Sequence, residues 1–172
     1  MRFADFLKAT VLLSAGTATL LAAIAVIGVS RDDDRTLLLF CVFWWVGAGL
    51  VGIWLGRRAE ASPPIARLLA TARAQTTLPE LRPGTTMVNR LWPLLLYAIA
   101  FSALGVFRPS VAAVAAGGAI IWALAWRRQE RAVLAIEERD GARFYVDRTS
   151  PFQPIRLVRT PGFGGAFLRQ GV

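Results

Sequence analysis

The sequence predicts an all-α integral membrane protein with four transmembrane helices arranged as two hairpins, an interfacial helix and a basic cytoplasmic tail. Three observations predict this class. Of the 172 residues, 55% are hydrophobic and 18% are charged, whereas soluble domains carry about 25% charged residues. Four long runs contain no Asp, Glu, Lys or Arg. Most basic residues lie in the N-terminal segment, the link between the second and third runs, and the tail, and few lie in the two short turns. Such an unequal division is typical of the two sides of a membrane protein.

The four uncharged runs are long enough to cross a bilayer as helices. They are 21, 21, 17 and 17 residues long, and a crossing helix needs roughly 17–25 apolar residues. Only Arg108 and Pro109 separate the third run from the fourth, so these two could instead form one buried hairpin. Two crossings are favoured because this pair suits a turn. The runs cover residues 9–29, 36–56, 91–107 and 110–126.

The basic residues predict the orientation of the spans. Lys and Arg gather on the cytoplasmic side of bacterial membrane proteins. Seventeen of the 20 precede the first run, lie in the link 57–90 or follow Trp126. Both termini are therefore expected in the cytoplasm, and the net charge of +9 is expected to act on the anionic inner leaflet. The abundance of Arg and Ala over Lys suggests a bacterial source, so the membrane expected is the bacterial inner membrane.

The chain is expected to divide after Trp126. Residues 1–126 form the transmembrane domain, including the cytoplasmic link 57–90. In that link, Ser62 before two prolines is typical of a helix start. Apolar residues then recur at helical spacing, which predicts a short amphipathic helix. It lies either on the inner membrane surface or against the ends of the bundle. The apolar positions are Ile65, Leu68, Leu69 and Ala72.

Residues 127–172 are expected to form a cytoplasmic helical extension followed by a basic tail. Residues 127–139 contain strong helix formers and lack Gly and Pro. Gly141 is a reasonable stop for that helix. Further along, residues 155–159 could form one short extended strand. The tail is too short to build a core of its own, so it needs a surface to lie on.

Small residues in the spans predict how the helices pack. In lipid, helices associate through close van der Waals contact rather than through burial of apolar surface. The second span has small residues at four-residue spacing, and the fourth is rich in Ala and Gly. Packing within the bundle is favoured, and docking of a partner subunit is the alternative. The expected helix-packing residues are Ala48, Gly52, Gly56, Ala115, Gly117 and Gly118.

Arginines at the ends of the second and fourth spans are expected to meet lipid headgroups. Each can gain about 1 kcal/mol near an anionic leaflet. Inside the second span, Trp44, Trp45 and Trp54 could stack on a lipid, quinone or pigment, but lipid-facing aromatic filler is favoured. The headgroup residues are Arg57, Arg58, Arg127, Arg128 and Arg131.

The residue counts exclude several kinds of chemistry. With no histidine and one cysteine, the chain lacks the base of Ser–His and Cys–His catalysis and the thiolates of an iron–sulfur cluster. Cys41 lies in an apolar run and is expected to be inert. Asp32, Asp33 and Asp34 could bind a divalent cation weakly, but a solvated cluster beside two arginines is favoured. No cofactor and no metal are expected.

The function expected is that of a non-catalytic accessory or scaffold subunit of a larger bacterial membrane protein complex. Spans without ionisable groups lack the usual marks of proton relays and ion-coupled transport. The expected partners are membrane lipids and other membrane subunits. Nucleic acid is not expected, because topology already explains the basic charge. The alternatives are a small oligomeric transporter or pore, and a lipid-acting membrane enzyme using Glu60, Glu130 or Glu137.

Overall fold

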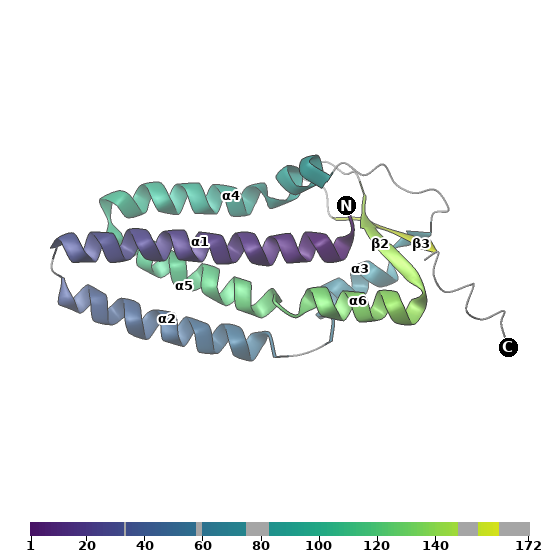
Figure 1. Ribbon diagram of the computed structural model, residues 1–172, viewed down its shortest axis with the longest axis horizontal. Coiled ribbons are helices and arrows are strands. Elements are labelled where there is room, and N and C mark those ends of the chain that lie inside the picture. Colours follow the sequence, from purple (N-terminus) through teal and green to yellow (C-terminus); the bar gives the residue numbers. More distant parts are fainter. Residues whose placement is uncertain (33, 58–59, 75–82, 148–154, 162–172) are drawn as a thin grey trace. The chain divides into compact units, whose positions relative to one another are not determined.

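The computed structural model describes most of the chain, namely residues 1–32, 34–57, 60–74, 83–147 and 155–161. Within these ranges the chain forms six helices and three strands, and helix dominates (Figure 1). The helices are α1 (Phe3–Asp32), α2 (Arg35–Leu55), α3 (Pro63–Ala70), α4 (Pro83–Phe107), α5 (Pro109–Trp126) and α6 (Gln129–Asp140). The strands are β1 (Arg73–Ala74), β2 (Ala142–Val146) and β3 (Leu157–Pro161).

These elements belong to two compact units, each assembled from segments that are distant in the sequence. The helical bundle comprises Lys8–Arg58 and Leu91–Arg128. The α/β unit comprises Met1–Leu7, Ala59–Arg90 and Gln129–Val172. The sequence-based division is a single cut after Trp126, whereas here the first residues and the link join the segment that follows α5.

Four helices are long and apolar enough to cross a membrane, as the sequence predicts: α1, α2, α4 and the helical segment that begins with α5. A helix of 21 residues, such as α2, is about 30 Å long, which matches the hydrocarbon core of a bilayer. Large apolar side chains face outward from the bundle, with Phe43 76% and Phe107 81% exposed. In water such exposure would be costly, but in lipid it is the ordinary state of a spanning helix. These four helices fit a multi-pass membrane protein.

The connections between these helices are very short. The carboxylate of Asp34 accepts a hydrogen bond from the Leu37 N–H at 3.0 Å and caps the start of α2. Arg108 alone separates α4 from α5, and Pro109 then occupies the first turn of α5, where its missing N–H costs nothing. Gly28 of α1 allows this turn to pack closely, because a β-carbon there would overlap the Pro109 ring.

The α/β unit contains a three-stranded sheet in the order β1-β3-β2. Strand β2 is antiparallel to β3, with Phe144 opposite Arg159, and β1 is parallel to β3. The free edge of β2 meets the start of the chain, because Arg2 bridges to Tyr145 and the Met1 carbonyl accepts the Val146 N–H at 3.0 Å.

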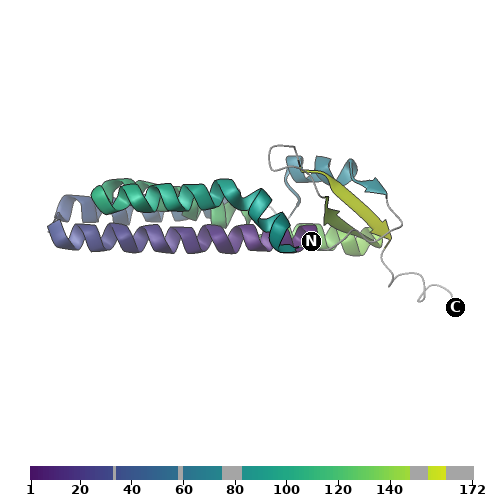
Figure 2. The ribbon, with the colours of Figure 1, turned by 90° about the horizontal axis from the view of Figure 1, so that it is seen from above.

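Both faces of the sheet are covered. Phe144, Tyr145 and Val146 are consecutive in β2 and all buried. Because successive side chains of a strand point to opposite faces, burial of all three requires cover on each side. Figures 1 and 2 show α3 and α6 beside the sheet. The unit therefore has a core of its own, which includes Ile65 of α3 and Val133 of α6, 2% and 0% exposed.

The sheet is the main departure from the all-α prediction. The expected strand at 155–159 is present, shifted to Leu157–Pro161, but β1 and β2 were not expected. Strand β1 has only two residues, and β2 is buried on both faces, so neither shows the alternation that indicates a half-buried strand.

The two predicted cytoplasmic helices are present with small differences. The amphipathic helix is α3, whose residues Ile65 and Leu69 are buried within the protein, so its apolar face packs on the α/β unit. The helical extension is α6, which begins after a turn at Arg127 and Arg128 instead of continuing α5 unbroken. Gly141, at φ +56°, follows α6 in the left-handed conformation that ends many helices.

Candidate interfaces: the α2–α5 contact and the arginine-rich end

Helices α2 and α5 approach each other closely along the small residues of α2. Ala48 is 2% exposed. A β-carbon on Gly52 would lie 2.8 Å from the Leu124 Cβ and 3.1 Å from the Ile121 Cα. A β-carbon on Gly56 would overlap the Leu124 carbonyl oxygen. Any larger side chain at these two glycines would therefore push the helices apart.

The small residues of α5 admit aromatic side chains from neighbouring helices. A β-carbon on Gly117 would overlap the Trp44 indole, and one on Gly118 would lie 3.2 Å from the Tyr97 hydroxyl oxygen. Ala115 is 4% exposed. The predicted α5 residues therefore contact α2 and α4 side chains that carry hydrogen-bond donors.

Three aromatic side chains donate hydrogen bonds to three consecutive carbonyls of α5. Trp45 Nε1 donates to the Ala113 carbonyl at 2.9 Å, and Trp44 Nε1 donates to that of Val114 at 3.1 Å. The Tyr97 hydroxyl donates to the Ala115 carbonyl at 2.8 Å. A carbonyl oxygen has two lone pairs, so it can accept these bonds in addition to its bond within the helix. Each donor thereby avoids the cost of an unpaired N–H or O–H in hydrocarbon.

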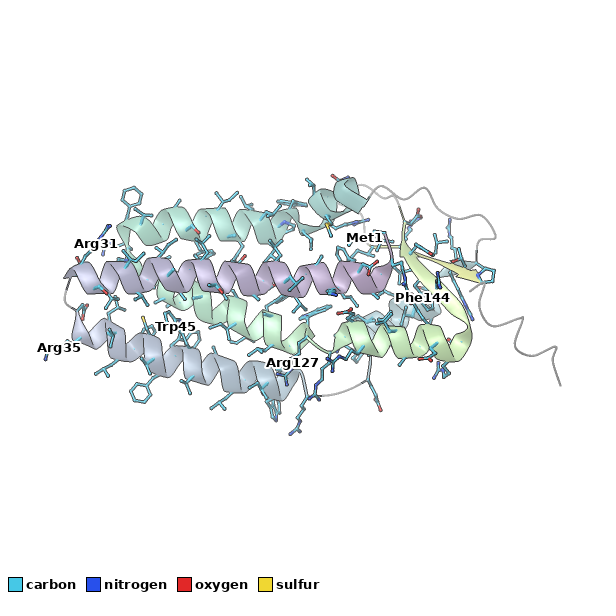
Figure 3. The ribbon with its side chains drawn as sticks, in the orientation of Figure 1. Met1, Arg31, Arg35, Trp45, Arg127 and Phe144 are labelled. Carbon is cyan, nitrogen blue, oxygen red and sulfur yellow. The ribbon has the colours of Figure 1, made fainter. Side chains whose placement is uncertain are left out.

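These bonds correct the interpretation of two tryptophans as lipid-facing filler. Trp44 and Trp45 are partly buried and bonded to α5, whereas Trp54 is 60% exposed. Sequence reasoning missed the difference because all three lie in the same uncharged run. The side of α2 on which each tryptophan lies is informative only once it is known that α5 packs against α2. Figure 3 labels Trp45 within the bundle.

Most of the predicted headgroup arginines lie where α2 and α5 end. Gly56, which follows α2, contacts Leu124 in the last turns of α5, so Arg57 and Arg128 follow at the same end of the bundle. Arg128 Nη1 donates to the Arg57 carbonyl at 2.8 Å. Figure 3 labels Arg127 at this end of the bundle, with Arg31 and Arg35 at the opposite end.

The positions of the other predicted arginines differ. Arg127 occupies the C-cap of α5 and is partly buried. Arg131 is exposed on α6, in the α/β unit. Arg58 lies outside the described residues.

The charges of Arg57, Arg127 and Arg128 have no carboxylate partner in the described part of the chain. The ion pairs there, with N–O distances of 4.0 Å or less, do not include these three arginines. The Arg57 guanidinium instead lies 5.5 Å from the centre of the Trp54 ring. Carbonyls at a helix C-terminus carry a partial negative charge, which offsets part of this positive charge but not a full unit per arginine.

The α/β unit holds a partly buried ion pair between Arg2 and Glu137. The Glu137 side chain is 5% exposed, and its Oε2 accepts from Arg2 Nη2 at 2.8 Å. Its Oε1 accepts the Phe144 N–H at 2.9 Å. This hydrogen bond to the carboxylate raises the pKa of Arg2 above its usual range. Both oxygens of Glu137 are thus engaged in holding the first residues, α6 and β2 together.

A second, partly buried polar contact joins the residue before α3 to the first residue of α6. The backbone N–H of Ser62, the residue before α3, donates to Gln129 Oε1 at 2.9 Å. Ser62 occupies the predicted cap position, but its side chain makes no capping hydrogen bond. Neither this contact nor the Arg2–Glu137 pair has a local sequence signal, because the partners are 67 and 135 positions apart.

Within the residues that the structure describes, no three His, Cys, Asp or Glu side chains gather where they could hold a metal ion. Asp34 of the acidic turn caps α2. Asp33 lies outside the described residues. Cys41 is a buried free thiol in the apolar centre of the bundle.

Comparisons of the chain with protein-family models, with curated proteins and with solved structures found no match.

Proposed function

We propose that this protein is a non-catalytic accessory or scaffold subunit of a larger membrane protein complex in the bacterial inner membrane. The proposal rests on the hydrogen bonds that polar side chains of the bundle make to its own backbone. The donors of Trp44, Trp45 and Tyr97 bond to carbonyls of α5, and Ser14 donates to the Thr10 carbonyl at 2.8 Å. A transport path or a catalytic site needs polar groups that are free to meet a solute or substrate. The three aromatic donors hold α2 and α4 against α5 instead, and the Ser14 hydroxyl is bonded within its own helix.

The make-up of the α/β unit supports two helical hairpins with both termini on one side of the membrane. Its segments precede most of α1, lie between α2 and α4, and follow α5. Segments that fold into one compact unit belong in one compartment. Helices α1 and α2 must then cross and return, as must α4 and α5. The excess of arginine in these segments supports the cytoplasm as that compartment.

The outer faces of the bundle are available to lipid and to other subunits. Gly47 and Gly49 of α2 have open space where a β-carbon would stand, unlike Gly52 and Gly56. A membrane helix can approach most closely where residues are small. The proposed partners are therefore membrane proteins and the anionic inner leaflet.

Native purification tests this proposal. The tag belongs at the carboxyl end, because Met1 and Arg2 pair with β2. After extraction in a mild detergent, sizing and mass spectrometry are expected to find the chain with the same membrane proteins in fixed stoichiometry. A Gly47→Leu variant, which adds volume on an open side of α2, is expected to lose them while keeping its fold. A stable monomer without copurifying protein would contradict the proposal.

A further inference from the structure

We propose that Arg57, Arg128 and Trp54 form a binding site for the phosphate group of one anionic phospholipid molecule. The site lies at the end of the bundle where α2 and α5 meet. It rests on the proposed function only in requiring that the bundle sits in a bilayer, and it does not depend on any protein partner.

The first step is that the two arginines are held together by the chain itself. Gly56 lets the end of α2 contact Leu124 of α5. Arg128 Nη1 then donates to the Arg57 carbonyl at 2.8 Å. This bond uses one of the five N–H donors of Arg128. It places the guanidinium of Arg128 beside the backbone of Arg57 and leaves donors for a ligand.

The second step concerns the orientation of Arg57. Its guanidinium lies over the Trp54 ring, 5.5 Å from the ring centre. A guanidinium that stacks on an aromatic ring makes this contact through the face of its own plane. The N–H groups at its edge remain free to donate. A planar edge of paired N–H donors matches two phosphate oxygens, which is why arginine binds phosphate bidentately.

The third step is the charge. Arg57 and Arg128 are exposed, and within the described ranges no carboxylate lies within 4.0 Å of either guanidinium. Both positive charges belong to residues at the same end of the bundle, so an anion bound there is attracted by each of them. A phosphate bound by both side chains satisfies their remaining donors. The opposite end differs, because its arginines, Arg31 and Arg35, adjoin the acidic turn that contains Asp34.

The fourth step identifies the phosphate as that of a lipid. Trp54 is 60% exposed in the last turn of α2, and indoles at the ends of spans lie at headgroup level. Below it on the same helix, Leu50 is 64% and Val51 46% exposed. A phosphate bound at Arg57 and Arg128 therefore has an apolar helix face beside it, along which acyl chains can lie. Free phosphate would make no use of that face.

Native mass spectrometry of the purified, delipidated chain tests the site, with phosphatidylglycerol, phosphatidylcholine and inorganic phosphate as separate probes. The wild-type chain is expected to retain one phosphatidylglycerol. R57Q/R128Q is expected to weaken its apparent affinity at least tenfold, and R57K/R128K, which keeps the charge but loses the planar fork, by a few fold. The matched control R31Q/R35Q removes two arginines from the other end and is expected to bind like wild type.

Three results would overturn the site. One is undiminished phosphatidylglycerol binding by R57Q/R128Q. Another is equal retention of phosphatidylcholine. The third is displacement of the lipid by millimolar inorganic phosphate, which would show that the acyl chains contribute nothing. Circular dichroism and sizing establish that each variant is folded, and R57K/R128K distinguishes lost recognition from lost folding. Because these measurements use the purified chain, they are independent of whether a protein complex is found.

Discussion

The helical bundle and the α/β unit are stabilised by opposite means. The bundle brings backbones together at Gly52 and Gly56 and satisfies its aromatic donors on α5 carbonyls. The α/β unit packs large apolar side chains and pairs the buried carboxylate of Glu137 with the partly exposed Arg2. The difference follows from the two solvents. Water drives apolar side chains together and tolerates charge nearby, whereas lipid rewards close packing and makes every unpaired polar group costly.

The comparison predicts that removing a charge damages the α/β unit most. In Glu137→Ala, Arg2 loses its partner and the buried Phe144 N–H loses its acceptor. We expect the α/β unit to lose about 3 kcal/mol, at the low end for a broken buried pair because Arg2 is partly exposed. Hydrogen-exchange mass spectrometry should show faster exchange in α6 and β2 with unchanged exchange in the bundle. Exposed Glu138 on the same helix supplies the control, and equal exchange in E137A and E138A would refute the expectation.

In the bundle, the corresponding damage comes from adding volume. Gly52→Leu places a side chain where Leu124 and Ile121 already stand. Overpacking costs typically 1–3 kcal/mol, and about 2 kcal/mol is expected here. The free energy of unfolding can be measured by SDS titration in mixed micelles. Gly47→Leu, on the open side of α2, should leave it nearly unchanged, and similar losses in both variants would argue against the α2–α5 contact.

A smaller effect is expected at the turn between α1 and α2, where the bundle meets water. Asp34→Ala removes the acceptor for the Leu37 N–H at the start of α2. Loss of such a cap typically costs about 1 kcal/mol. The same SDS titration measures it, with Asp32→Ala as a neighbouring carboxylate that caps no helix start. The cap has no such role if D32A and D34A unfold alike.

The smallest expected effect is the loss of one aromatic donor inside the bundle. Tyr97→Phe keeps the ring but removes the hydrogen bond to the Ala115 carbonyl. Interhelical hydrogen bonds in membrane proteins average about 0.6 kcal/mol, because polar groups also find partners when the protein is unfolded in the membrane. Trp45→Phe should act similarly, and Trp122→Phe, whose indole is 51% exposed, serves as the control. A loss several times larger would mean that these bonds fix the path of α5.

The spans could be predicted from the sequence because lipid imposes a local rule. A crossing helix must be long and free of ionisable side chains, and that condition is visible in one stretch of sequence. The start of α3 and the end of α6 were also predictable, because Pro63 and Gly141 constrain the backbone locally.

The partners of these elements could not be predicted, because they depend on distant residues. Stripes of small residues occur on α1 as well as on α2, but the α2 stripe at Ala48 and Gly52 packs against α5, whereas Ala15 and Thr19 on α1 are exposed. The sheet joins Arg73 to Val158, and neither strand is long enough to stand out alone. At the candidate site, each arginine was predictable from its place after a span. The contact between Arg57 and Arg128 could not be predicted, because it depends on α2 and α5 ending next to each other.

The bridge between Arg2 and Tyr145 also sets an order of events during synthesis. Arg2 is translated among the first residues, whereas β2 follows all four spanning helices. At about 5–20 residues per second, β2 leaves the ribosome roughly 7–30 s after Arg2. Throughout that interval Arg2 lacks Tyr145, the residue to which it bridges, and Glu137, the acidic partner of its ion pair. Closure of the α/β unit therefore requires that all four long apolar helices have already been synthesised.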